Sequence, residues 1–301
     1  MKKICGLIIG ISIILSFCCY GNDGRDVSPS FYISGLLPLP EQQGTDSISG
    51  SIYIVNHFWN DLNFKDTIYS HNRDFIEQNF SNFARFLINM EDTVQRKNAV
   101  KELMDKAEVD TLAYRLIADV AYKFLYAPDA PMENEETYIP FLEIFSESGF
   151  LNEAQRGRNR FLLNAALKNR PGRLASDFQY ISRDGNELSL YTTLVNGRIL
   201  LIFYDPDCDT CKETLLRLAS CSELNETIKR GELTVLAIYS GEDKELWEKT
   251  AYSLPSDWIV GYEEGIIDEE ESYYFRSSPS IYILDEEKKV LIKDLPLSQL
   301  F

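Results

Sequence analysis

Two cysteines separated by two residues carry the clearest chemical signal in this chain. Cys208 and Cys211 follow an apolar run at 200–204 that predicts a buried strand, and the residues after them predict a helix. The start of a helix carries partial positive charge, so a cysteine placed there favours the thiolate over the thiol. Cys211 lies one turn further on, close enough to form a disulfide with Cys208. Together with Pro279 at the start of a later predicted strand, this arrangement indicates a site of thiol–disulfide exchange.

The cysteine pair has two other conceivable uses. A structural zinc site needs about four Cys or His ligands, and beyond the N-terminal segment the chain offers only Cys221, His57 and His71 besides the pair. The histidines lie in a helical region and Cys221 follows Cys211 on what reads as the same helix, so no metal is predicted. A purely structural disulfide would close a very short loop, which constrains the unfolded chain little. That use stays open as part of an alternative function.

Carboxylates surround the predicted nucleophile. Asp205 and Asp207 precede Cys208, and Asp209 follows it. Negative charge nearby raises the pKa of a thiol, while the start of a helix lowers it. We expect the carboxylates to dominate, which would stabilise the disulfide form and make the protein a reductant. Asp207 has an alternative role as the N-cap of the helix, a position where Asp is common.

The N-terminal residues 1–19 have the features of a secretory signal. A basic start at 1–3 leads into an apolar run at 4–17, which is shorter than the roughly 20 residues that span a bilayer as a helix. Cys18 and Cys19 close this segment and predict cleavage and lipidation of a bacterial lipoprotein at one of them. The predicted location is therefore the cell envelope, facing the periplasm or on the outer membrane, with membrane contact through the lipid anchor. Release as a soluble periplasmic protein is the alternative.

The composition is that of a folded, acidic protein. The chain has 301 residues, of which 45 % are hydrophobic, and a net charge of −17 with a pI of about 4.6. This length is enough for two domains, and the hydrophobic content is enough for real cores. The negative charge argues against nucleic acid as a partner, because phosphates would be repelled.

Hydrophobic periodicity divides the chain at about residue 170. Residues 20–50 are polar and predict a tether, and residues 51–170 show helical spacing that predicts an all-α domain of about five helices. Residues 171–301 then predict an α/β domain with a mixed central sheet. Its elements are a hairpin around 178–190, strands at 200–204, 233–239, 281–284 and 290–293, one helix from 208 to about 224, and another around 244–252.

The second domain resembles the extracytoplasmic thioredoxin-like proteins of the TlpA/ResA type, from about residue 172 to the end. The resemblance rests on the segment 172–178, the turn Asp184-Gly185, the pair Phe203-Tyr204, and the order of Cys208, Cys211, Ser278 and Pro279. It implies that the two cysteines are the active-site pair and that a cis-proline at 279 faces them. Two departures are Asp207, where the family has Trp, and Ile202, where thioredoxins bury an Asp.

The helical region resembles an uncharacterised helical domain that precedes thioredoxin-like domains in bacterial envelope proteins. The run at 131–140 carries this likeness. The resemblance implies a shared architecture for the whole chain and no particular activity for the helices.

The predicted function is thiol–disulfide exchange in the cell envelope, as a disulfide reductase. Cys208 would attack a substrate disulfide and Cys211 would resolve the mixed disulfide. The expected partners are protein thiols or disulfides and an upstream redox partner. No cofactor is expected besides the redox-active disulfide.

The resemblance also implies which residues contact the substrate. These are Ser278, Pro279, Tyr204 and Asp207, with the Ser278 backbone pairing with the substrate as an extra strand. The alternative function is a non-catalytic binding lipoprotein, in which the helical domain recognises a partner and the thioredoxin-like fold is a scaffold.

Overall fold

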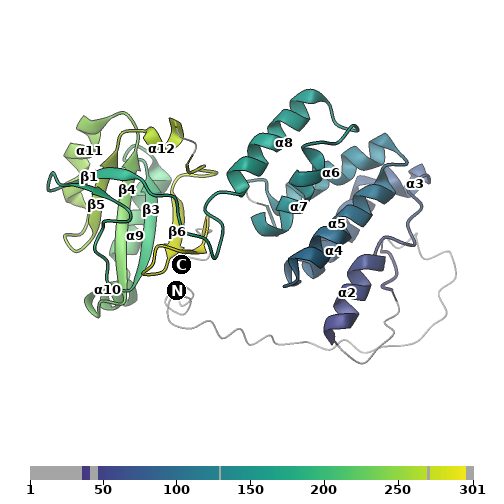
Figure 1. Ribbon diagram of the computed structural model, residues 1–301, viewed down its shortest axis with the longest axis horizontal. Helices are drawn as coiled ribbons and strands as arrows, with labels where there is room; N and C mark the ends of the chain where they lie inside the picture. Colours follow the sequence, from purple (N-terminus) through teal and green to yellow (C-terminus); the bar gives the residue numbers. More distant parts are fainter. Residues whose placement is uncertain (1–35, 41–46, 129, 270–271, 296–301) are drawn as a thin grey trace. The chain divides into compact units, whose positions relative to one another are not determined.

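The computed structural model describes residues 36–40, 47–128, 130–269 and 272–295 (Figure 1). The chain divides into two compact units between Ala166 and Leu167. The predicted signal segment, with Cys18 and Cys19, lies outside the described residues. Among the helices that are described, none is long and apolar enough to cross a membrane.

The first unit is built from helices in the part that the structure describes. They are α2 (Ser47–His57), α3 (Thr67–Ser70), α4 (Arg73–Ile88), α5 (Thr93–Ala107), α6 (Thr111–Leu125), α7 (Glu135–Phe145) and α8 (Glu153–Ala166). The predicted all-α character is confirmed. The five predicted helices correspond to α4 to α8, and the structure adds α2 and the short α3.

Aromatic side chains fill the core of this unit. Phe80 and Phe83 of α4 are completely buried, and the ring of Phe80 lies 5.9 Å from that of Phe141 on α7. Helix starts are fixed locally, because a side-chain oxygen at the N-cap accepts a hydrogen bond from the first turn. The N-caps that do so at α4, α5, α6 and α7 are Asn72, Asp92, Asp110 and Asn134.

The second unit contains a seven-stranded sheet in the order β2-β1-β5-β4-β3-β6-β7. The strands are β1 (Gln179–Ser182), β2 (Glu187–Ser189), β3 (Arg198–Tyr204), β4 (Leu233–Ser240), β5 (Ile259–Glu263), β6 (Ser280–Leu284) and β7 (Val290–Ile292). Strands β3, β4 and β5 are parallel, whereas β6 runs antiparallel to β3. The predicted α/β domain with a mixed sheet is confirmed.

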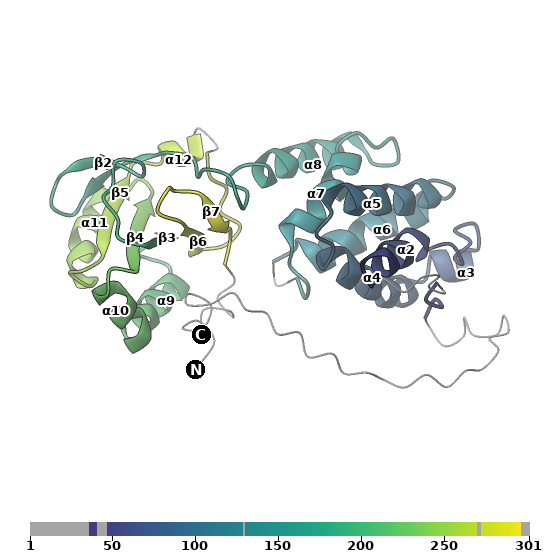
Figure 2. The same ribbon diagram turned by 60° about the horizontal axis from the view of Figure 1, so that its bottom comes forward.

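Helices cover both faces of this sheet. Helices α9 (Asp209–Ala219), α10 (Ser222–Lys229) and α11 (Lys244–Thr250) contribute to one hydrophobic cluster, and α12 (Ile266–Glu269) contributes to the other. Figure 2 shows α9 and α10 on one side of the sheet and α12 on the other. The cluster under α9 includes Ile202 and Ile281, so α9 is held against the centre of the sheet.

One prediction about this unit was wrong, and one strand was missed. The single helix expected from 208 to about 224 is two helices, because α9 ends with Ser220 as its C-cap and Cys221 is the N-cap of α10. Strand β5 was not predicted. Four of its five residues are buried, so it lacks the alternation of polar and apolar residues that marks a strand in sequence.

Candidate active site

The turn between β3 and α9 carries the cysteine pair. The backbone N–H of Cys208 donates to the carbonyl oxygen of Asp205 at 3.1 Å, and the N–H of Asp207 donates to Oδ1 of Asp205 at 2.8 Å. These bonds fix the path of the chain beyond the carboxyl end of β3, the edge where sites in α/β sheets commonly form.

Cys208 is itself the N-cap of α9. Its backbone is extended, with φ −75° and ψ 119°, and its Sγ accepts a hydrogen bond from the N–H of Cys211 at 3.3 Å. Sulfur therefore occupies the acceptor position that an Asx or Ser oxygen usually fills, at the positive end of the helix. The alternative role for Asp207 as the cap is wrong, because the helix begins one residue later than that role requires.

Burial makes the two thiols chemically different. Cys208 is partly exposed, whereas Cys211 is 0 % exposed. Burial raises the pKa of Cys211 to about 11. Burial also opposes ionisation of Cys208, but hydrogen bonds from Cys211, the Ser278 side chain and the Thr210 backbone outweigh it and lower the pKa of Cys208. Cys208 thus presents the more accessible and more acidic sulfur of the pair, and Cys211 the buried and less acidic one.

The carboxylates do not dominate the pKa of Cys208. Asp205, Asp207 and Asp209 are all exposed, and the pKa of Cys208 is lowered, with burial and hydrogen bonds as its causes. The expectation that the acids would raise this pKa is therefore wrong. Water screens exposed charges, whereas the hydrogen bonds to sulfur act at contact. Lys212 also lies among the acids, with its Nζ 3.5 Å from Oδ1 of Asp209.

The segment before β6 closes the site from the other side. The Ser278–Pro279 peptide bond is cis, as the resemblance implies, and Pro279 is buried. The Cys208 thiol lies 3.7 Å from the carbonyl oxygen of Ser278. The Ser278 hydroxyl lies 3.1 Å from Sγ of Cys211, so either atom donates. The sequence had suggested only a backbone role for Ser278, and no local pattern signals that its side chain reaches Cys211.

Tyr204 lies behind the cysteine pair at the end of β3. Only 6 % of the residue is exposed, and its hydroxyl has no hydrogen-bond partner among the described residues. Burial raises its pKa. Ile202, on the same face of β3, is fully buried in the same hydrophobic cluster. Apolar packing and one phenol therefore lie where thioredoxins place a carboxylate.

The two histidines have structural partners in the first unit. Nδ1 of His57 lies 2.8 Å from the Tyr53 carbonyl oxygen, and Nε2 of His71 lies 2.8 Å from Oδ1 of Asp110. Across the residues that the structure describes, no group of three or more His, Cys, Asp or Glu side chains is arranged to hold a metal ion.

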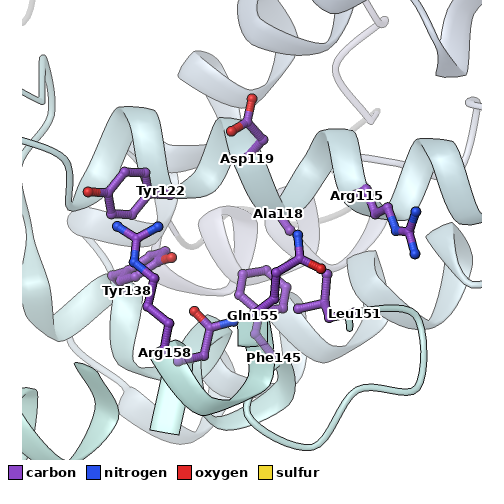
Figure 3. A pocket seen from close by; sticks show the side chains of 10 residues that line it. Arg115, Ala118, Asp119, Tyr122, Tyr138, Phe145, Leu151, Gln155 and Arg158 are labelled. Atoms are coloured by element: carbon purple, nitrogen blue, oxygen red, sulfur yellow. The ribbon is translucent and has the colours of Figure 1, made fainter. Parts of the chain in front are cut away.

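A small hollow in the first unit is another concave feature with polar walls. It encloses about 120 Å³ between α6, α7 and α8, and Figure 3 shows the side chains around it. The guanidinium of Arg158 lies over the ring of Tyr122 at 4.7 Å. None of the predicted site residues lies here, and the volume of this hollow is much smaller than that of the usual ligand pocket, roughly 300–1,000 Å³.

Comparison with protein-family models assigns the first unit. Residues 36–169 match the family described as a domain of unknown function (DUF5106). None of the curated proteins matches the chain.

Comparison with solved structures covers both units. A thioredoxin-like protein from Bacteroides caccae is 33 % identical, with a TM-score of 0.77 over 87 % of this chain and 95 % of that chain. A conserved protein of unknown function from Bacteroides fragilis is 36 % identical, with a TM-score of 0.41 over 44 % of this chain and 96 % of that chain. The thioredoxin domain of a thiol-disulfide oxidoreductase from Bacteroides vulgatus is 24 % identical, with a TM-score of 0.37 over 44 % of this chain and 92 % of that chain.

Proposed function

Because the chain belongs to the thioredoxin-like proteins, with a DUF5106 domain ahead of its thioredoxin-like domain, we propose that it catalyses thiol–disulfide exchange through Cys208 and Cys211. One observation carries the proposal. A partly exposed sulfur caps α9 and accepts a hydrogen bond from the N–H of Cys211, whose own sulfur is buried behind it. Exchange needs this division between an accessible thiolate and a protected second thiol.

The proposed reaction proceeds in two displacements. The Cys208 thiolate attacks one sulfur of a substrate disulfide, the substrate S–S bond breaks, and the departing sulfur takes up a proton. The Cys211 thiol then loses its proton and attacks the sulfur of Cys208, which releases the second substrate sulfur as a thiol. One substrate disulfide is thereby reduced to two thiols by two electrons and two protons, while the protein dithiol is oxidised to a disulfide.

Ser278 is the residue proposed to assist the second displacement. Its hydroxyl lies 3.1 Å from Sγ of Cys211, so it can donate a hydrogen bond to the thiolate as that thiolate forms. The pKa of Cys211 is about 11 with this hydrogen bond in place, and it would be higher still without it, which would leave even less thiolate near neutral pH. Pro279 and the Ser278 backbone are proposed to contact the substrate, as are Tyr204 and Asp207.

The location and the partners are proposed from the sequence. Lipidation at Cys18 or Cys19 would anchor the protein in the cell envelope, where disulfides form and persist. Protein disulfides are the proposed substrates, and an upstream dithiol partner is needed to return the pair to its reduced form after each turnover. The direction proposed from the sequence is reduction of the substrate. The lowered pKa of Cys208 stabilises the thiolate and removes the carboxylate argument for that direction, so the reduction potential decides it.

The reduction potential of the pair tests this function. The full-length mature chain is equilibrated in graded thiol buffers, and free thiols are counted by mass, with Cys208→Ser and Cys211→Ser variants as controls. We expect a reversible potential within the range of about −270 to −120 mV spanned by exchange proteins. A value in the lower part of this range would support a reductase. A pair that never forms a disulfide, or one with a potential below about −300 mV, would overturn the proposal in favour of a non-catalytic binding protein.

A further inference from the structure

An apolar cavity adjoins the cysteine pair on the α9 side of the sheet. Its volume is about 360 Å³, within the usual range of roughly 300–1,000 Å³ for ligand pockets. Three segments form its walls: the turn before Cys208, one side of α9, and the segment that follows α11. The residues that matter for its chemistry are Tyr204, Pro206, Leu215, Leu216, Leu254 and Pro255.

The far wall of the cavity is held in place by Arg183. Its guanidinium donates to the carbonyl oxygens of Ala251, Leu254, Pro255, Ser256 and Trp258, at 2.6 to 3.5 Å. A half-buried cation that donates to five carbonyl oxygens of one loop fixes the backbone of that loop. The wall is therefore formed before any ligand arrives, which lowers the entropic cost of binding.

The cavity offers an apolar surface to an occupant. Leucine and proline side chains form most of its lining, and although Tyr204 also lines it, the Tyr204 hydroxyl is buried and closed to an occupant. The cavity therefore suits an aromatic ring, and tyrosine and tryptophan combine such a ring with a polar end that can stay in water at the rim.

The rim of the cavity beside Cys208 carries three carboxylates and one lysine. Asp205 and Lys212 line the cavity, and the exposed residues Asp207 and Asp209 flank Cys208 in the chain. This rim is therefore acidic on balance.

Lys212 partly offsets these negative charges. Its Nζ donates to the Asp207 carbonyl oxygen at 3.2 Å and lies 3.5 Å from Oδ1 of Asp209. A partner segment with lysine or arginine is thus favoured electrostatically.

We propose that this cavity receives a tyrosine or tryptophan side chain of the polypeptide that presents its disulfide to Cys208, and that the acidic rim selects a lysine or arginine beside it. This inference rests on the proposed function and names its substrate class. The aromatic ring would pack on Leu215 and Leu216, with its polar end at the mouth of the cavity.

The test compares four peptides that differ only beside one cysteine. Each carries that cysteine as a mixed disulfide with thionitrobenzoate, flanked by tyrosine or serine on one side and by lysine or glutamate on the other. Release of thionitrobenzoate by the reduced, full-length mature chain gives second-order rate constants. We expect the tyrosine–lysine peptide to react about tenfold or more faster than the serine–glutamate peptide, and the contribution of lysine to shrink in high salt. Exchange with 2-hydroxyethyl disulfide is measured in parallel.

Two matched variants locate the preference. Leu216 is 68 % exposed and Leu194 is 91 % exposed, so glutamate is tolerated at both, but Leu194 lies away from the cavity lining. Leu216→Glu should reduce the tyrosine-over-serine ratio to within twofold, and Leu194→Glu should keep it.

Each result has a defined meaning. If the protein exchanges with 2-hydroxyethyl disulfide but reacts with all four peptides within a twofold range, this inference is overturned and the proposed function stands. If it exchanges with neither, both are overturned. A preference that survives Leu216→Glu would place recognition elsewhere. A second-order rate constant for the peptides that falls as the protein concentration rises, while that for 2-hydroxyethyl disulfide stays constant, would mean that a second copy of the chain covers the cavity. That result would also overturn the inference.

Discussion

Replacing Arg183 with alanine is the sharpest test of how the site is supported. The side chain reaches from the end of β1 to a loop about seventy residues later, where it donates to five carbonyl oxygens. The three shortest contacts, to Pro255, Ser256 and Trp258, measure 2.9, 3.0 and 2.6 Å. Removing the guanidinium takes this donor from every acceptor, although the Pro255 carbonyl oxygen keeps a hydrogen bond from the N–H of Trp258 at 3.2 Å.

The expected loss follows from the strength of these bonds. Hydrogen bonds to a charged group contribute about 1.5–3 kcal/mol each, and the contributions do not simply add. Arg183 is half-buried, so water replaces part of what is lost. We therefore expect Arg183→Ala to lower the free energy of unfolding by about 3 kcal/mol. Arg183→Lys should recover little of it, because an ammonium offers only three donors and no planar fork.

Urea unfolding measures this loss. Two of the three tryptophans, Trp247 and Trp258, are buried in the thioredoxin-like unit, so their fluorescence reports on it. With a denaturant slope of about 2 kcal/mol/M, the midpoint should fall by about 1.5 M. Arg173→Ala is the matched control, since that guanidinium is exposed and makes no hydrogen bond with the described residues. A midpoint for Arg183→Ala within about 0.3 M of that control would refute the reasoning.

Three further outcomes are expected. Iodoacetamide should label Cys208 in the reduced protein at pH values below the ordinary cysteine range, and Cys211 only near pH 11, as mass spectrometry after a pH series will show. Ser278→Ala removes a hydrogen bond that lowers both thiol pKa values, so both labelling curves should move to higher pH and the exchange rate should fall by about tenfold, while Ser278→Thr should preserve them. Burial raises the pKa of Asp294, so the folded state holds a proton that the unfolded state loses first, and stability should fall as pH rises through that interval. Asp294→Asn should remove this part of the pH dependence of the urea midpoint, and an unchanged pH dependence would show that another group is responsible.

The placement of Cys208 at the start of a helix could be predicted from the sequence because it depends on residues close by in the chain. A strand, a short turn and a helix start are all encoded within about fifteen residues of Cys208, and the local bonds of the turn and of the cap join residues at most three apart. The order of the cysteines and of Ser278-Pro279 likewise identified the fold. The predicted signal segment and lipidation site rest on the sequence alone.

The sequence around Cys208 led to wrong predictions where two local effects compete. The three aspartates beside Cys208 suggested a raised thiol pKa, and Asp207 was the alternative helix cap. The structure shows the thiol sulfur as the cap and a lowered pKa of Cys208. Sequence gives the number of charges but not their exposure, and exposure decides how strongly water screens them.

Tertiary structure alone decided which distant groups meet at the site. Ser278 reaches Cys211 across 67 positions because β6 pairs with β3, an adjacency that no local pattern specifies. The same holds for Arg183 and the carbonyls of the loop that walls the cavity, 68 to 75 positions away. Local propensities encode the cysteine pair and the turn that carries it. The burial of Cys211, its hydrogen bond with Ser278 and the cavity beside the pair depend instead on the order of strands in the sheet, which is set by packing of the whole domain.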